Sequence, residues 1–442
     1  MTRACGLILA APASGSGKTL VTAGLLRLLH RHGVKVAAAK AGPDFIDPTF
    51  HAAASGRSCP NLDVWAMRDA TLAAIVAELE RDAELVLCEG VMGLFDGAGP
   101  EGEEGSTAAV ARLTGWPVIL VVDARGQGAS VAALLRGFAG HRPDVALAGV
   151  IFNRVSSPRH AGLLAAAAAR DLPDIAVLGT LPAEPSLALP ARHLGLVPAA
   201  ELPGLEAVIE RAADAIAQSI DVDRLLQLSR PSVLAGPGGK AGIPPFGQRI
   251  VVARDDAFCF TYQSLLEGWQ RAGAEIGFFS PLAGEPPDPE ADAVYLPGGY
   301  PELSAGRLAT GPVFMTGLRN AAAAGKTIYG ECGGYMALGE SLIDADGRCH
   351  RMAGLLPLVT SFAERRLSLG YRCATSLMDG PLGPAGALFR GHEFHYATIA
   401  DERPGEQRLW QAVDALGTDL GVCGLRRGSV FGSFIHLIDR AD

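Results

Sequence analysis

The sequence predicts an α/β protein of two domains, and three observations support this fold class. Short, continuous apolar runs alternate with amphipathic segments along most of the 442 residues, a pattern typical of parallel strands buried between helices. A glycine-rich loop, "APASGSGKTL" at residues 11–20, follows the first apolar run. A stretch rich in Pro and Gly at residues 229–248 divides the chain into halves of about equal size, and this composition is typical of a linker.

The first half, residues 1–228, is predicted to form a doubly wound, mostly parallel sheet. Its helices are expected at residues 18–33 and 130–143. Its strands are expected in the apolar runs at residues 6–12, 35–42, 84–90, 117–124 and 147–155. The second half, residues 249–442, is predicted to be another α/β domain with more antiparallel or irregular structure towards its end. Its strands are expected in the runs at residues 249–260, 275–281, 293–299 and 327–334.

Composition narrows the class of protein. The formal net charge of −9 argues against a general nucleic-acid binder. No apolar stretch is long enough to span a bilayer, and the N-terminal apolar run leads into the glycine loop, so it is interpreted as a strand rather than a signal peptide. The eight cysteines are scattered without a CxxC pair, which favours a reducing compartment. We expect a cytoplasmic protein that binds neither nucleic acid nor membrane, and a homodimer stays open.

The glycine loop resembles a phosphate-binding loop with Pro12 where the pattern G-x-x-x-x-G-K-[ST] has its first glycine. The loop lies between a predicted strand and a helix, so its N–H groups can approach phosphate oxygens closely. Lys18 would bind the β- and γ-phosphates of ATP, and Thr19 would bind Mg²⁺. The alternative is a plain glycine turn before a helix. The other predicted ATP-binding residues of the loop are Ser14, Gly15, Ser16 and Gly17.

Further polar residues follow other predicted strands of this half, at the edge where open α/β sheets bind ligands. Glu89 ends a strongly apolar run and can hold Mg²⁺; a helix N-cap is the alternative, although Glu is a poor N-cap. "KAGPDFIDPTFH" places Lys40 beside Asp44 and Asp47, and the alternative is a turn without function. Asn153 ends a later strand, and its amide can present a donor and an acceptor to adenine.

The second half contains the motif of an activated cysteine. Cys332 lies in "GECGG", a G-x-C-x-G sequence that is typical of a nucleophile elbow between a strand and a helix. We expect the helix N-terminus to lower the pKa of its thiol. Gly298 and Gly299 in "YLPGGYPE" could supply N–H groups to an oxyanion hole, together with Gly333.

His436, at the end of an apolar run near the C-terminus, is the candidate base for this cysteine. The alternatives are a small buried cysteine and a core histidine. His392 and His395 also lie close together, in "GHEFHY". A metal site needs further ligands that are not obvious here, so a substrate-facing or structural strand is the preferred interpretation.

Together these motifs resemble the a,c-diamide synthases of corrinoid biosynthesis, which are glutamine-dependent amidotransferases acting on cobyrinic or hydrogenobyrinic acid. The resemblance covers nearly the whole chain. It is carried, in order, by "APASGSGKT", "KAGPDFIDPTFH", "CEGVMGLFDG", "VARDDAFCFTY", "YLPGGYPE", "GECGGYM" and "GHEFHY". The family's first domain is similar to dethiobiotin synthetase, whose loop also departs from the first-glycine pattern. Its second domain is similar to the class I glutamine amidotransferases.

The resemblance implies a role for each matched residue. Cys332 would be the glutaminase nucleophile and His436 its base. Lys18, Thr19 and Glu89 match nucleotide and Mg²⁺ positions. Lys40 matches a phosphate-facing lysine and Asn153 an adenine-reading position. The chain departs from the pattern at Ile438, where most class I domains carry a Glu two residues after the histidine. The third triad member is therefore absent or comes from elsewhere, and a slow glutaminase is our hypothesis.

The implied reaction, in cobalamin biosynthesis, uses ATP and L-glutamine. The γ-phosphoryl group of ATP would activate the a and c acetates of hydrogenobyrinic acid as acyl phosphates, which ammonia then captures. Asp44, Asp47 and Asp96 are candidates for holding Mg²⁺ or for positioning the acetate. Cobyrinic acid and nickel sirohydrochlorin are alternative substrates. A P-loop ATPase that binds a partner protein and carries an inactive glutaminase-like module is the alternative from another class.

Overall fold

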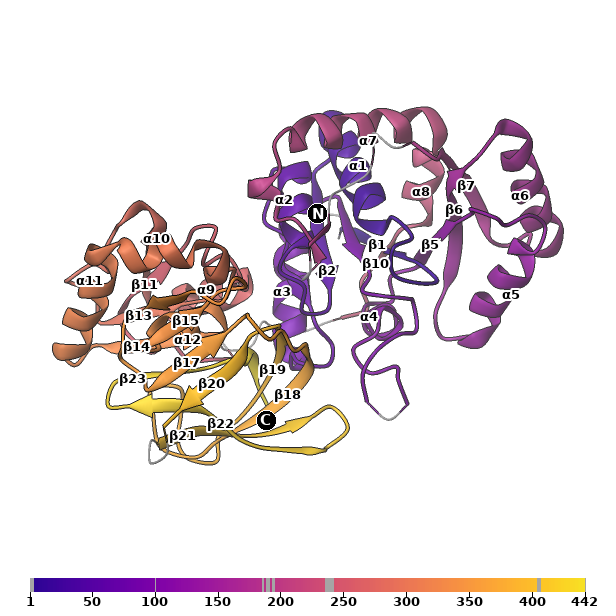
Figure 1. Ribbon diagram of the computed structural model, residues 1–442. Helices are drawn as coiled ribbons and strands as arrows, with labels where there is room; N and C mark the ends of the chain where they lie inside the picture. Colours follow the sequence, from indigo (N-terminus) through magenta and orange to yellow (C-terminus); the bar gives the residue numbers. More distant parts are fainter. Residues whose placement is uncertain are drawn as a thin grey trace. The chain divides into compact units, whose positions relative to one another are not determined.

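The structure is a computed structural model that describes residues 4–99, 101–184, 187, 191–192, 195–234, 242–403 and 407–441. The chain divides into two compact units (Figure 1). The first unit consists of Met1–Trp65 and Asp69–Gly239, and the second of Ala66–Arg68 and Lys240–Asp442. No helix among the described residues is long and apolar enough to cross a membrane.

The described part of the first unit is built on a large sheet with the order β3-β2-β4-β1-β5-β6-β7, in which neighbouring strands are parallel. A separate two-stranded sheet pairs β8 Ala191–Arg192 antiparallel with β9 Gly195–Leu196. A short strand, β10, pairs antiparallel with β1. This arrangement confirms the predicted parallel, doubly wound sheet. The strands are β1 Cys5–Ala10, β2 Val36–Ala41, β3 Asn61–Leu62, β4 Leu85–Glu89, β5 Val118–Asp123, β6 Leu147–Val155, β7 Ala176–Pro182 and β10 Arg230–Pro231.

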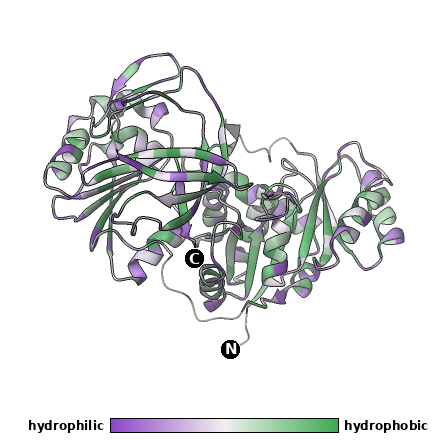
Figure 2. Cartoon of the chain, turned by 90° about the horizontal axis from the view of Figure 1, so that it is seen from below, coloured by the Kyte–Doolittle hydropathy of each residue, from purple (hydrophilic) through white to green (hydrophobic). Residues whose placement is uncertain are grey.

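The core of this unit explains why its strands are apolar on both faces. Leu7 and Leu9 of β1 pack in one cluster with Leu25 of α1 and Ile216 of α7, while Ile8 between them is also fully buried. Figure 2 shows the strands of the sheet as mostly hydrophobic. The helices are α1 Lys18–Arg31, α2 Asp47–Ser55, α3 Asp69–Arg81, α4 Thr107–Thr114, α5 Val131–His141, α6 Pro158–Asp171, α7 Leu205–Ser219 and α8 Val222–Leu228.

The second unit contains a larger sheet with the order β12-β11-β13-β14-β23-β22-β21-β18-β19-β24. Its first five strands are parallel, and the rest are antiparallel, as the sequence predicts. The strands are β11 Arg249–Ala253, β12 Glu275–Phe279, β13 Ala293–Leu296, β14 Thr327–Glu331, β18 Ser368–Ser376, β19 Leu388–His395, β21 Gln407–Asp414, β22 Asp419–Arg427, β23 Val430–Ser433 and β24 His436–Arg440.

A smaller sheet with the order β16-β15-β17-β20 and several helices complete the described part of the second unit. β14 pairs parallel with β23, which brings the end of the chain beside the cysteine turn. The remaining elements are α9 Gln263–Arg271, α10 Ala305–Thr310, α11 Pro312–Ala323, α12 Gly333–Leu338, β15 Ser341–Ile343, β16 Cys349–Arg351, β17 Leu358–Ser361 and β20 Thr398–Glu402.

The predicted linker, residues 229–248, is described only at its two ends, because residues 235–241 lie outside the described residues. At its start, Arg230–Pro231 forms β10 on the first unit. At its end, Ile243 and Phe246 are buried, and the Phe246 ring lies 5.0 Å from that of Trp269 in the second unit. The start of the predicted linker is therefore part of the first unit, and its end is part of the second unit.

Candidate active site

The glycine loop lies between β1 and α1. Gly15 and Gly17 adopt φ angles of 78° and 93°, a left-handed region in which a side chain would be strained. A Cβ on Gly17 would also lie 2.4 Å from Nδ2 of Asn153. The hydroxyl of Ser16 donates to the carbonyl of Ala13 at 2.8 Å and closes the loop.

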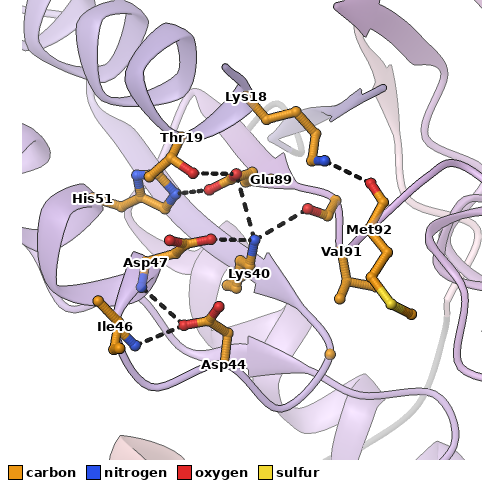
Figure 3. A network of polar contacts seen from close by, with 12 residues as sticks. Lys18, Thr19, Lys40, Asp44, Ile46, Asp47, His51, Glu89, Val91 and Met92 are labelled. Atoms are coloured by element: carbon orange, nitrogen blue, oxygen red, sulfur yellow. Dashed lines mark hydrogen bonds and ion pairs between the residues drawn. The ribbon is translucent and has the colours of Figure 1, made fainter. Parts of the chain in front are cut away.

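Lys18, the first residue of α1, is buried and already has a hydrogen-bond acceptor. Its Nζ donates to the carbonyl oxygen of Met92 at 2.6 Å (Figure 3). Burial lowers the pKa of Lys18, and the charge of Glu89 opposes this effect. The ammonium keeps two further N–H groups that can donate to a phosphate. No motif in the sequence indicates this contact with the carbonyl of Met92.

Glu89 is the centre of a buried polar network at the ends of β2 and β4 (Figure 3). Its Oε1 accepts from the hydroxyl of Thr19 at 2.9 Å and lies 3.4 Å from Nζ of Lys40. Its Oε2 lies 2.5 Å from Nε2 of His51. Lys40 also pairs with Oδ2 of Asp47 at 2.7 Å. The fold thus gathers Thr19, Lys40 and Asp47, which the sequence singled out, around the carboxylate of Glu89, with Asp47 joined through Lys40.

The charges in this network are unbalanced. Burial alone would lower the pKa of Lys40, but Asp47, Glu89 and Asp44 outweigh it and raise that pKa above its usual range. Burial alone would raise the pKa of Glu89, but Lys40, His51 and Lys18 hold it at about 2. Burial, Asp44 and Glu89 together raise the pKa of Asp47 to about 7, against the effect of Lys40. The site has more carboxylates than nearby cations, an environment that attracts a further cation.

Asp44 and Asp96 each hold a loop in place. Oδ1 of Asp44 accepts from the backbone N–H groups of Ile46 and Asp47 at the start of α2, at 2.7 and 2.9 Å. Oδ2 of Asp96 accepts from the N–H of Gly93 at 2.9 Å. These contacts match the alternative of a turn-forming role, and each carboxylate retains a second oxygen for Mg²⁺ or substrate.

A cavity of about 850 Å³ opens beside the loop. Asp96 and Ser16 are not among the residues that line it. The predicted site residues that do are Ser14, Gly15, Gly17, Lys18, Thr19, Lys40, Asp44, Asp47, Glu89 and Asn153.

Asn153 lies at the end of β6 and contacts the glycine loop. Its Nδ2 donates to the carbonyl of Ser16 at 2.9 Å, and its Oδ1 accepts from the N–H of Arg154 at 2.9 Å. Arg154 donates to the carbonyl of Gly15 at 2.7 Å and pairs with Asp123 at 2.6 Å. The sequence did not point to this second tether, since Arg154 follows Asn153 without a recognisable motif.

In the second unit, Cys332 occupies the turn between β14 and α12. Its φ of 46° and ψ of −104° are strained for a residue with a side chain, as a nucleophile elbow requires. The expected lowering of its thiol pKa is wrong for this structure. Burial raises the pKa of Cys332 above its usual range, Glu302 adds to the effect, and the N–H of Gly333 opposes it without prevailing.

The glycines predicted for the oxyanion hole surround this cysteine closely. A Cβ on Gly298 would lie 2.3 Å from Cε1 of His436 and 3.3 Å from Cβ of Cys332. A Cβ on Gly333 would lie 3.1 Å from the backbone nitrogen of Gly299. The structure therefore brings Cys332, His436 and the three glycines together, and only glycine fits at Gly298.

His392 and His395 lie on β19 next to the candidate base. The ring of His392 stacks on that of His436 with centroids 5.1 Å apart, and its Nδ1 lies 3.1 Å from the hydroxyl of Tyr262. His395 stacks on Phe434 at 4.0 Å. Within the described ranges, no group of three or more His, Cys, Asp or Glu residues could hold a metal ion.

Two residues of the site were missed by the sequence analysis. His51 lies on α2, is fully buried and contacts the carboxylate of Glu89. Its position one helical turn after Asp47 is the sequence feature that could have indicated it. Glu331 precedes the cysteine directly, and its Oε2 lies 3.7 Å from Nδ1 of His436. An acid at the end of an apolar strand was its signal.

Comparison with known proteins follows this division of the chain. Residues 7–197 match the model of the CobQ/CobB/MinD/ParA nucleotide binding domain, and residues 249–442 match that of the CobB/CobQ-like glutamine amidotransferase domain. A protein of Brucella ovis named hydrogenobyrinate a,c-diamide synthase is 54% identical over 98% of both chains. Proteins of the same name from Rhizobium meliloti and Rhodobacter capsulatus are each 52% identical over 98% of this chain, and over 99% and 98% of their own.

Proposed function

Because this chain belongs to the family of hydrogenobyrinate a,c-diamide synthases, we propose that it amidates the a and c acetates of hydrogenobyrinic acid. It is a glutamine-hydrolysing ligase with a nucleotide-binding domain. The observation that carries the proposal is 52–54% identity over 98% of the chain to proteins of that name. We also propose that the reaction takes place in the cytoplasm, because scattered cysteines without a CxxC pair favour a reducing compartment.

The first unit would activate the carboxylate. An acetate is a poor electrophile, and transfer of the γ-phosphoryl group from ATP converts it to an acyl phosphate with a good leaving group. The N–H groups of residues 15–19 would bind the phosphates at the start of α1. Lys18 and Lys40 would stabilise the charge of the transferring group.

The donor set also fits Mg²⁺. This ion prefers oxygen ligands and uses one or two carboxylates plus phosphates and water rather than a complete protein cage. Glu89 and the hydroxyl of Thr19, 2.9 Å apart, are such ligands. Asp47 is close by, because it forms an ion pair with Lys40, which also pairs with Glu89. When bound, Mg²⁺ would neutralise charge on the ATP phosphates.

The second unit would supply ammonia. Cys332 would attack the glutamine carboxamide, and the N–H groups near Gly298, Gly299 and Gly333 would stabilise the oxyanion. His436 would carry the thiol proton to the leaving ammonia and then activate the water that hydrolyses the thioester. Ammonia displaces phosphate from the acyl phosphate and gives the amide.

The division of labour is tested by Cys332→Ala. We expect this variant to lose glutamine-dependent amidation and to keep amidation driven by ammonium chloride, measured by mass spectrometry of the macrocycle. Loss of both activities would contradict two separate sites. Retention of glutamine-dependent activity would contradict the role of Cys332.

The substrate is tested by measuring ATP hydrolysis with glutamine and each of three macrocycles. We expect stimulation by hydrogenobyrinic acid and a doubly amidated product. Stimulation by cobyrinic acid or nickel sirohydrochlorin alone would assign a different substrate within the family. A homodimer stays a prediction that light scattering can check.

A further inference from the structure

We propose that Glu331 is a positioning residue for His436 and takes the place of the missing triad acid at Ile438. The proposal rests on the proposed roles of Cys332 and His436. In most class I domains the acid that orients the histidine lies two residues after it. Here the acid would come from the end of β14, directly before the nucleophile.

Strand pairing places Glu331 against the end of the chain. β14 and β23 are parallel, and Glu331 is in register with Ser433. The N–H of Cys332 donates to the carbonyl of Ser433 at 2.8 Å, and the N–H of Leu437 donates to Oε1 of Glu331 at 3.1 Å. These contacts leave Oε2 of Glu331 3.7 Å from Nδ1 of His436. This separation lies within ion-pair range but exceeds that of a hydrogen bond, so the imidazole would have to move slightly towards Glu331 to form one.

Two tyrosines fix the carboxylate in this position. Tyr295 donates to Oε2 at 2.8 Å and Tyr329 to Oε1 at 2.7 Å. Burial and the charge of Glu331 raise the pKa of both tyrosines well above its usual range, so the hydroxyls remain protonated donors. With the N–H of Leu437, three donors orient a side chain that is 2% exposed. Such preorganisation is typical of the acid in a catalytic triad.

Three other residues near His436 do not supply this charge. His392 stacks on the imidazole from β19, and burial and His436 lower the pKa of His392 well below its usual range, so it stays neutral. Ile438 lies two residues after His436, on the same face of β24, but it is apolar. Gly298, after β13, provides only backbone.

The chemical role follows from the proton balance. As Sγ of Cys332 bonds to the carboxamide carbon, its proton passes to Nε2 of His436, and the imidazole becomes an imidazolium. The proton then goes to the leaving nitrogen as the C–N bond breaks, which releases ammonia. A carboxylate at Nδ1–H fixes the tautomer in which Nε2 can accept, and it stabilises the imidazolium.

The experiment removes the negative charge at residue 331 and then introduces one at residue 438. In the full-length protein, we expect Glu331→Gln to lower kcat for glutamine hydrolysis by about 100-fold while KM changes by less than about 2-fold. The same preparation should keep amidation driven by ammonium chloride. Adding Ile438→Glu to Glu331→Gln puts an acid at the position of other class I domains, and we expect it to recover about 10-fold in kcat.

A matched control separates orientation from packing. Tyr329→Phe keeps the carboxylate and removes one donor, so we expect a smaller fall in kcat, about 5-fold. An unchanged kcat in Glu331→Gln would overturn the proposal. So would loss of ammonium-driven amidation, or equal activity in Glu331→Gln and the double variant, because either outcome would assign Glu331 to packing. If Cys332→Ala kept glutamine-dependent activity, the role proposed for Cys332 would fail instead.

Discussion

The Nζ atom of Lys40 lies 2.7 Å from Oδ2 of Asp47, with side chains that are 3% and 14% exposed. The same ammonium lies 3.4 Å from Oε1 of Glu89. A single buried lysine thus compensates two carboxylates in the proposed phosphoryl-transfer site. Removing one partner of a buried ion pair leaves an uncompensated charge, which destabilises a protein more than the intact pair stabilises it.

We therefore expect Lys40→Met to lower the free energy of unfolding by about 3 kcal/mol at neutral pH and to abolish phosphate release from ATP. Urea denaturation and a phosphate assay measure the two effects. Lys35→Met, at an exposed position five residues earlier, is the matched control and should change neither. Adding Asp47→Asn to Lys40→Met should recover part of the stability, and a further loss of similar size would contradict the pairing.

The difference in stability between wild type and Lys40→Met should also depend on pH. Glu89 has a pKa held at about 2, with Lys40 as its strongest charge partner, so its stabilising contribution is complete above the unfolded pKa of about 4.3. It is lost as the pH falls from there towards about 2. We expect the difference in unfolding free energy to narrow as the pH falls, first near pH 7, where Asp47 gains its proton, and again below about pH 5. A difference that grows on acidification would show that Lys40 does not stabilise Glu89.

Gly298 allows a second prediction, because its missing side chain leaves room for the base. In Gly298→Ala, the new Cβ would lie 2.3 Å from Cε1 of His436, so the imidazole must move. Displacing a catalytic group by about 1 Å can cost about 100-fold in rate, and we expect such a fall in glutamine-dependent amidation with ammonium-driven amidation unchanged. Gly306→Ala, where the nearest atom would be 3.7 Å away, should be neutral. Full glutaminase activity in Gly298→Ala would argue against His436 as the base.

The buried thiol of Cys332 gives a third prediction. Because burial raises its pKa and only the thiolate is alkylated, iodoacetamide should label Cys332 slowly at neutral pH. A cysteine peptide with the ordinary pKa of about 8.5, mixed into the same sample, serves as the reference. The labelling rate of the reference peptide should level off above the pKa of its thiol. The labelling rate of Cys332, followed by mass spectrometry, should continue to rise at higher pH. A rate at Cys332 that levels off near neutrality would show a lowered pKa, as the helix N-terminus alone would predict.

The fold was predictable from the sequence because strands buried on both faces are apolar throughout. The run at 147–155 matches β6 residue for residue. The run at 249–260 does not match, since β11 ends at Ala253 and the buried Ala257 and Phe258 belong to a turn closed by the N–H of Phe258 on the carbonyl of Asp255. Apolar character alone does not distinguish a strand from a buried turn.

Site residues that belong to a single sequence motif could be predicted. Contacts between residues that lie far apart in the sequence could not, because only the fold brings them together. Thr19 and Lys18 belong to a loop pattern, whereas the carbonyl of Met92 that holds Lys18 is defined only by tertiary structure. Glu331 and His436 are likewise adjacent because β14 pairs with β23. The thiol pKa of Cys332 was predicted wrongly because the sequence reveals the helix dipole but not the burial that outweighs it.

Asn153 has two proposed uses that predict different results. The sequence assigns its amide to adenine, and the structure shows its Nδ2 on the carbonyl of Ser16 in the glycine loop. A residue that binds adenine discriminates between bases. Its loss therefore changes the ratio of the kcat/KM values for ATP and GTP. A residue that tethers the loop acts on phosphates that both nucleotides share, so its loss leaves that ratio unchanged.

We expect Asn153→Ala to lower kcat/KM for ATP and GTP in the same proportion, by about 10-fold, as the loss of one hydrogen bond of about 1 kcal/mol and some order in the loop would cause. Ammonium-driven amidation of hydrogenobyrinic acid with each nucleotide measures the ratio. Arg154→Lys, which shortens the other tether at the carbonyl of Gly15, should lower both values to a similar degree. A selective loss for ATP in Asn153→Ala, absent from Arg154→Lys, would assign the amide to adenine. The tether would then be secondary to base recognition.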